Sequence, residues 1–158
     1  MKKDSLFPGS FIIHPLSLFS VLVIIFNDFY IKPSKNFPLI AGKLSDIFLM
    51  IFLPIFLSFI FVFIKYLINS ILIIFKKDLE ENYKLPYFII IISIIISGSI
   101  MILLQTSDWF NLFFQKEIII LKEFFSNRKY YNINLTKDLY DLISIPFLII
   151  PYLFLKRR

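Results

Sequence analysis

The sequence predicts an all-α fold: an integral membrane four-helix bundle with an additional interfacial amphipathic helix. Hydrophobic residues make up 58% of the chain, and 21 of its 158 residues are phenylalanine. Soluble domains contain roughly 45–50% apolar residues, and one core of this size cannot bury the surplus. Several uncharged apolar runs approach or exceed the length that crosses a bilayer. We therefore treat residues 1–158 as a single transmembrane domain.

The first two helices follow from uncharged runs and their flanking residues. The first is expected over about residues 11–27, where a basic start is followed by an apolar run without a small-x-small cleavage site, which favours a retained helix over a cleaved signal peptide. The second is expected over 45–65 or longer, because apolar residues resume after Lys65. Pro54 is predicted to kink this helix rather than end it, since membrane helices tolerate proline.

The remaining helices are predicted from one long run, one short run and one amphipathic stretch. Residues 87–106 lie in an uncharged run that spans easily. The last uncharged run covers only about 21 Å as a helix, so the fourth helix is expected over about 137–155, which draws Asp141 to the hydrocarbon edge. Residues 109–126 place apolar and polar side chains on opposite half-turns. This pattern predicts a helix lying in the interface or, alternatively, a lid over the polar cluster described next.

The polar residues at the helix ends are expected to meet at one membrane face. Four crossings place the ends of helices one and three on the same side as the starts of helices two and four. Gln105 to Asp108 end the third helix. The candidate polar cluster consists of Asn27, Asp28, Lys43, Ser45, Asp46, Asp138 and Asp141.

Two interpretations of this cluster stay open. In the structural one, Ser45 caps the second helix with Asp46 at its positive end, and Asp138 and Asp141 form a capping box on the fourth. Asp28 would then need a cation, either Lys43 or Lys32. In the functional one, the charges mark a site, because ionisable groups at membrane depth are costly. The catalytic candidates are then Asp28, Asp46 and Asp141.

Composition also limits cofactors, partners and orientation. The chain has no cysteine and one histidine, so we expect no metal and no cofactor. Net charge is +6, but the basic residues flank apolar runs, which favours a bilayer with anionic lipid as partner and no nucleic acid. Basic residues are almost equally divided between the two faces. Because Lys76-Lys77 and Lys156-Arg157-Arg158 adjoin helices directly, we predict cytoplasmic termini in the inner (cytoplasmic) membrane.

Several short elements resemble an uncharacterised family of small bacterial multi-pass membrane proteins. They are His14-Pro15, Asn27-Asp28, Gly42-Lys43-Leu44-Ser45-Asp46 and Asp138-Leu139-Tyr140-Asp141-Leu142. The likeness covers about residues 14 to 150, and Ile47 stands where that family has phenylalanine. The resemblance implies membrane residence and assigns no activity. Asp28-x-x-x-Lys32 is also similar to the first-helix motif of lipoprotein signal peptidase, whose glycine-rich Asn-x-x-Asp-Arg element this chain lacks.

Three functions are compatible with these features, and the sequence does not decide whether the protein is an enzyme. The first is a non-enzymatic membrane assembly or lipid-interacting protein, with a protein partner or a second copy of the chain as possible additions to lipid. The second is an intramembrane aspartate-dependent hydrolase at the outer membrane–water interface, in which Asp46 and Asp141 activate water and Lys43 holds an anion. The third is a proton- or cation-coupled carrier acting as an oligomer.

Overall fold

The computed structural model describes residues 8–32, 38–74, 85–126 and 137–157, and every regular element within these ranges is helical. The predicted all-α class is therefore confirmed. The elements in order are a short 3₁₀ turn η1 (Pro8–Phe11), α1 (Pro15–Phe26), a π-helical turn η2 (Asn27–Ile31), α3 (Pro38–Ile74), α4 (Tyr87–Thr106), α5 (Asp108–Ser126), a 3₁₀ helix η3 (Leu139–Leu148) and α6 (Ile149–Lys156).

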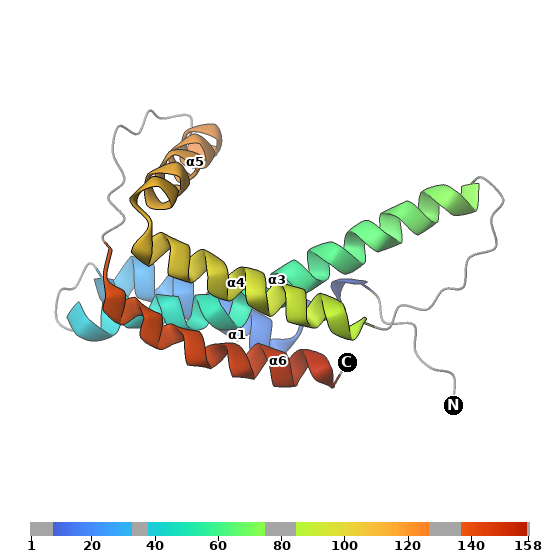
Figure 1. Cartoon of the computed structure of the whole chain (residues 1–158), viewed down its shortest axis with the longest axis horizontal. Coiled ribbons are helices and arrows are strands. Elements are labelled where there is room, and N and C mark those ends of the chain that lie inside the picture. The colour runs from blue at the N-terminus through green and yellow to red at the C-terminus, as the bar shows by residue number, and fades with distance from the viewer. Residues whose placement is uncertain (1–7, 33–37, 75–84, 127–136, 158) are drawn as a thin grey trace.

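The bundle is built around α3. This helix contacts α1 on one side and α4, η3 and α6 on the other. Helices α1 and α4 run in one direction, and α3 and the rod that η3 forms with α6 run in the other (Figure 1). One end of the bundle, which we call the acidic end, therefore carries Lys43, Asp138 and Asp141. The opposite end, which we call the terminal end, carries His14, Tyr87 and Arg157.

Small residues let the helices pack closely in the bundle interior. Ser58 of α3 donates a hydrogen bond to Ser93 of α4 over 3.0 Å, and both side chains are fully buried. A Cβ on Gly98 would lie 3.2 Å from Leu148 Cδ1, so α4 and η3 approach closely because residue 98 has no side chain. Such small-residue contacts are typical of helix packing in membranes, where apolar burial alone gives no preference for protein over lipid.

Three of the described helical stretches are long and apolar enough to cross a membrane: Lys43–Ile71, Tyr87–Thr106 and Leu139–Lys156. The stretch Pro15–Ile31 is equally apolar in character but shorter. Many large apolar side chains on these helices are exposed, among them Leu22, Phe88 and Ile95. Exposure to lipid accounts for such a surface, because a soluble protein would bury most of these groups.

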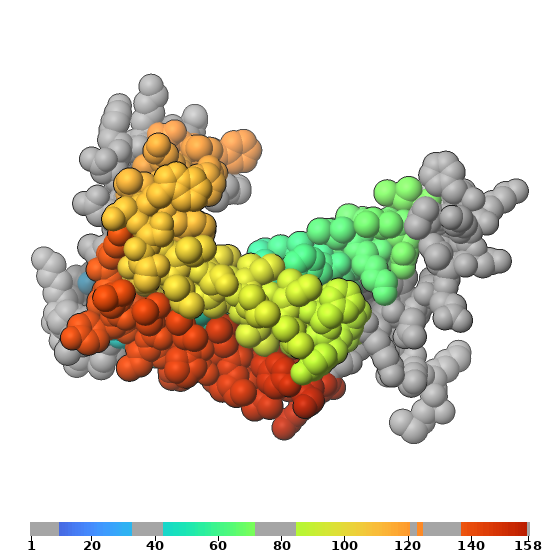
Figure 2. Space-filling model, in the orientation of Figure 1, coloured from blue at the N-terminus to red at the C-terminus, as the bar shows by residue number. Residues whose placement is uncertain are grey.

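Helix α3 is one unbroken helix and is longer than the expected minimum. It continues through Pro54 and past Lys65 to Ile74. Beyond the bundle its second half projects as an arm (Figures 1 and 2) with apolar side chains such as Leu67 and Ile71 exposed. At 1.5 Å per residue, the apolar stretch Lys43–Ile71 is about 43 Å long, well beyond the roughly 30 Å hydrocarbon core, so it must tilt or run into the interface.

Helix α5 turns sharply away from α4 and stands clear of the bundle (Figures 1 and 2). Ser107, in an extended conformation with φ −105° and ψ 119°, interrupts the helical path between them. Its hydroxyl accepts a hydrogen bond from the Phe110 N–H over 3.3 Å, which caps α5. Asn111 is buried and donates to the Leu104 carbonyl over 3.0 Å, fixing the first turn of α5 against the last turn of α4.

Candidate functional site

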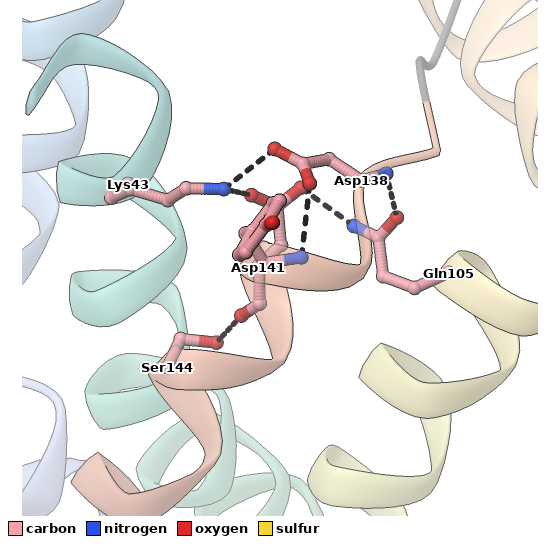
Figure 3. A network of polar contacts seen from close by, with 6 residues as sticks. Lys43, Gln105, Asp138, Asp141 and Ser144 are labelled. Carbon is pink, nitrogen blue, oxygen red and sulfur yellow. Dashed lines mark hydrogen bonds and ion pairs between the residues drawn. The ribbon is translucent and has the colours of Figure 1, made fainter. Parts of the chain in front are cut away.

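Lys43 lies at the centre of the acidic end. From the second turn of α3 its ammonium reaches across to the start of η3, where it forms ion pairs with Asp138, at 2.8 Å, and with Asp141 (Figure 3). The Lys43 side chain is 25% exposed and that of Asp141 only 13%. An ion pair with this little solvent costs far more to break than one on the surface, because the remaining charge is left unpaired.

Gln105, in the last turn of α4, connects the same two acids. Its amide nitrogen donates to Asp141 over 2.9 Å, and its amide oxygen accepts the Asp138 N–H over 2.9 Å (Figure 3). We call Lys43, Gln105, Asp138 and Asp141 the Lys43 network. It joins α3, α4 and η3 through hydrogen bonds in which each residue has two partners within the network.

Asp138 also begins the last helix, as the capping interpretation predicts. Its carboxylate accepts the Tyr140 N–H over 2.9 Å, while its carbonyl accepts the Asp141 N–H over 2.8 Å. The hydrogen bond from the Lys43 ammonium, followed by that from the Tyr140 N–H, holds the pKa of the Asp138 carboxyl below its ordinary value. Asp141 does not complete a capping box. Its carboxylate turns instead to Lys43 and Gln105.

Ser45 and Asp46 lie inside α3, so the expectation that they form its cap is wrong. The helix begins at Pro38, and proline is favoured in a first turn because it has no N–H to leave unpaired. Asp46 follows Lys43 by three residues and faces the same neighbours. Its carboxyl group lies close enough to Asp141 for the two to interact directly. Ser45 is buried beside them.

Asp28 and Asn27 lie on a helix that continues past its expected end. The π-helical turn η2 extends α1 to Ile31, which places Asp28 and Lys32 one turn apart. Their ion pair measures 2.7 Å, and both side chains are nearly half exposed. Asp28 therefore pairs with Lys32, whereas Lys43 is engaged by Asp138 and Asp141. Asn27 is fully buried beside this pair, with its amide 3.5 Å from Asp28.

The structure thus separates the seven predicted residues into two groups at one end of the bundle. Lys43, Ser45, Asp46, Asp138 and Asp141 lie together at the contact of α3 and η3, and Asn27 and Asp28 lie apart on η2. Within the described part of the chain, no three His, Asp or Glu side chains are arranged to hold a metal ion. The chemistry available is that of carboxyl groups and one ammonium: ion pairing, proton transfer or the binding of a polar ligand.

Two sets of residues in the interior were not included in the predicted cluster. Gln105 falls among the residues expected at this face, yet nothing in its type distinguishes it from its neighbours Thr106 and Ser107. Buried serines are the second set. Their signal was present in Ser93 and Ser97, which are four residues apart and so share a face of an otherwise isoleucine-rich helix at the spacing of close helix contacts.

Comparisons of this chain with protein-family models, with curated proteins and with solved structures find no match. The resemblance to small multi-pass proteins therefore stays a prediction, and the assignment of function rests on the geometry.

Proposed function

We propose that this is a non-enzymatic multi-pass protein of a bacterial inner membrane that interacts with lipid at the membrane interface, with both termini cytoplasmic. The observation that carries the proposal is the exposed apolar stripe of α5. Trp109, Phe113, Ile120 and Phe124 fall within about 60° of the helix circumference at 100° per residue. All four are exposed, from 46% for Phe113 to 81% for Phe124.

The position of α5 supports a lipid partner for this stripe. The helix begins one residue after α4, whose apolar run ends at Thr106, so it starts at the edge of the hydrocarbon layer. It packs on α4, and the four side chains of the stripe are exposed. A helix that leaves a membrane span sideways with an apolar stripe on one face is suited to lie in the interface plane.

The Lys43 network supports a structural role for the acids. Lys43 pairs with two carboxylates, and Gln105 bonds to the Asp141 carboxylate and the Asp138 N–H, which joins three helices at the end from which α5 departs. Lys137 adds an ion pair to Asp108, connecting the approach to η3 with the first turn of α5. In this interpretation the acidic end is a support that holds α5 at its angle.

The single tryptophan makes the interfacial position measurable. Trp109 lies at the start of α5 and is 74% exposed. In proteoliposomes we expect its fluorescence to be quenched by lipids labelled near the headgroup and little by aqueous iodide. The double variant Trp109→Phe/Phe124→Trp moves the probe about 22 Å along the helix. If α5 lies in the interface plane, both probes report the same shallow depth.

Strong iodide quenching of both probes would contradict the proposal, because α5 would then project into water. A probe at position 124 that is quenched mainly by labels near the bilayer centre would contradict it as well, since α5 would then enter the hydrocarbon layer.

One observation favours a second candidate, an intramembrane aspartate-dependent hydrolase. Asp46 and Asp141 lie close enough to interact, which is the arrangement in which one carboxyl acts as general base and the other as general acid. Thermal unfolding in detergent separates the candidates. A supporting network predicts that Asp141→Asn melts several degrees below the wild type. A catalytic pair held at a cost in stability predicts that Asp46→Asn and Asp141→Asn melt at the same temperature or higher.

A further inference from the structure

An open groove lies at the terminal end of the bundle, opposite the Lys43 network. It has a volume of about 610 Å³, within the range of ligand-binding clefts. It is formed between the start of α1 and the outer face of α6. Its lining residues are His14, Leu16, Ile150, Leu153, Phe154 and Arg157.

On its α6 side, the groove is lined by one face of the helix. Ile150, Leu153, Phe154 and Arg157 are spaced i, i+3, i+4 and i+7, so they share one face. Arg157 lies at the outer end of this face, and Ile150 lies about 10 Å deeper along the helix. The groove therefore has a cation at its mouth and an apolar wall below it.

Neighbouring tyrosines indicate that the mouth of the groove lies at headgroup depth. The hydroxyl groups of Tyr87 and Tyr152 are 3.2 Å apart, at the start of α4 and within α6, and Tyr87 is more than half exposed. Tyrosines gather where the hydrocarbon layer meets the headgroups. The apolar stretch of the last span ends at Lys156, directly before Arg157.

The acidic side chains that the structure describes lie away from the terminal end. Every carboxylate that the structure describes lies at the acidic end or on α5, so none of them neutralises Arg157. His14 contributes a polar wall. Its Nδ1 accepts the Leu16 N–H over 3.2 Å, and its ring packs on Phe154 with centroids 4.4 Å apart.

We propose that this groove binds one anionic phospholipid, with the phosphate at Arg157 and an acyl chain along Leu153 and Ile150. Arginine suits phosphate because its planar guanidinium offers paired donors. The apolar wall, with Leu153 nearly half exposed, selects a lipid over a free phosphate, which would leave the wall open. The site is independent of the role proposed for α5, because the two lie at opposite ends of the bundle (Figure 1).

Binding of phosphatidylglycerol to the full-length protein in detergent, measured by native mass spectrometry, tests the proposal. Arg157→Gln is expected to weaken binding about tenfold, the size of one charge-assisted contact. Lys156→Gln is the matched control, since it removes the same charge one residue away, where the ammonium lies over the Tyr152 ring at 5.8 Å. That variant should change binding by less than about twofold. Phosphatidylcholine should bind at least tenfold more weakly than phosphatidylglycerol.

A second pair of variants tests the groove without altering charge. Ile150→Trp fills the wall and should abolish retention of phosphatidylglycerol, whereas Ile149→Trp, on the adjacent exposed position, should leave it intact. Equal losses for Arg157→Gln and Lys156→Gln would overturn the proposal in favour of general surface charge. Displacement of the lipid by millimolar inorganic phosphate would overturn it in favour of a simple anion site. Lipid retention by Ile150→Trp would place the lipid elsewhere on the protein.

Because the α5 experiments measure Trp109 depth and these measure lipid retention, failure of either leaves the other standing. An α5 that projects into water would not alter the binding expected at Arg157. Unchanged retention in Arg157→Gln would not move Trp109 from the interface.

Discussion

A basic side chain has different surroundings at the two ends of the bundle. At the acidic end, Lys43 is 25% exposed and pairs with two carboxylates, one of which also accepts a hydrogen bond from Gln105. At the terminal end, Arg157 is exposed at the mouth of an open groove, and no carboxylate in the described ranges pairs with it. A cation surrounded by acids stabilises the fold, and a cation without them is available to a ligand from outside.

The comparison also explains why charge alone does not identify a site in this protein. The sequence concentrates conspicuous acids at one end, which attracts a catalytic interpretation. In the structure these acids are partners of Lys43 and Gln105. The other end has few notable residues in the sequence, and its groove arises only from the spacing of α1 and α6.

The largest effect is expected from removing the cation of the acidic end. Lys43→Met removes the ammonium that pairs with both Asp138 and Asp141. Breaking a buried ion pair costs about 3–5 kcal/mol, and partial exposure of Asp138 reduces this to about 2–3 kcal/mol, or roughly 5 °C or more in Tm. Thermal unfolding in detergent at neutral pH measures it.

The exposed pair Asp28–Lys32 supplies the matched control. Lys32→Met removes a salt bridge whose side chains are 44% and 46% exposed, so it should cost less than about 1 kcal/mol. Equal Tm losses for the two variants would show that Lys43 has no special structural role.

A smaller loss is expected from Gln105→Glu. The substitution keeps an oxygen that accepts the Asp138 N–H but replaces the amide donor to Asp141 with a second carboxylate oxygen. The lost hydrogen bond and the added repulsion should cost about 1–2 kcal/mol by thermal unfolding. Thr106→Glu adds the same charge at the exposed neighbouring position and should change stability by no more than about 0.5 kcal/mol.

The fold was predictable because lipid imposes simple rules on the sequence. Uncharged runs of this length form helices in lipid, and the alternating direction of successive long helices brings these polar residues to one end of the bundle. α5 was predictable over 109–126 from its amphipathic pattern and runs from Asp108 to Ser126. Its sharp angle was not, because that depends on Asn111 reaching the Leu104 carbonyl.

Partner choice within the polar cluster could not be predicted from the sequence. Lys43 had two candidate roles, and which acid it meets depends on the rotation of α3 relative to η3, which no pattern reveals. Asp28 meets Lys32 because η2 prolongs the first helix by one wide turn. The start of α3 could not be predicted either, because the helix begins at Pro38, well before its charge-free run.

Acidification should weaken the Lys43 network through Asp138. The Lys43 ammonium and the Tyr140 N–H lower the pKa of this carboxyl in the folded protein. A carboxyl with a lowered pKa stabilises the fold above its unfolded pKa of about 4, and that contribution is lost as pH falls through the folded value. Tm should therefore drop below about pH 4, and Asp138→Asn should reduce the slope.

Asp108→Asn is the control for this pH dependence, because Asp108 also pairs with a lysine but its side chain is 89% exposed. Its pH profile should follow the wild type. An unaltered slope in Asp138→Asn would mean that other groups dominate the acid response.

The smallest effect on stability is expected from Arg157→Gln at the terminal end. An unchanged stability there is what a residue that binds a ligand, and does not support the fold, should show. In lipid-free detergent, Arg157→Gln should change the free energy of unfolding by less than about 0.5 kcal/mol, because Arg157 supports no described ion pair. Added phosphatidylglycerol should raise the Tm of the wild type, since a ligand that binds only the folded state stabilises it in proportion to the logarithm of its concentration. The variant should lose this response. A Tm loss in Arg157→Gln as large as that in Lys43→Met would make the two ends equivalent, and the distinction between a supporting cation and a binding cation would fail.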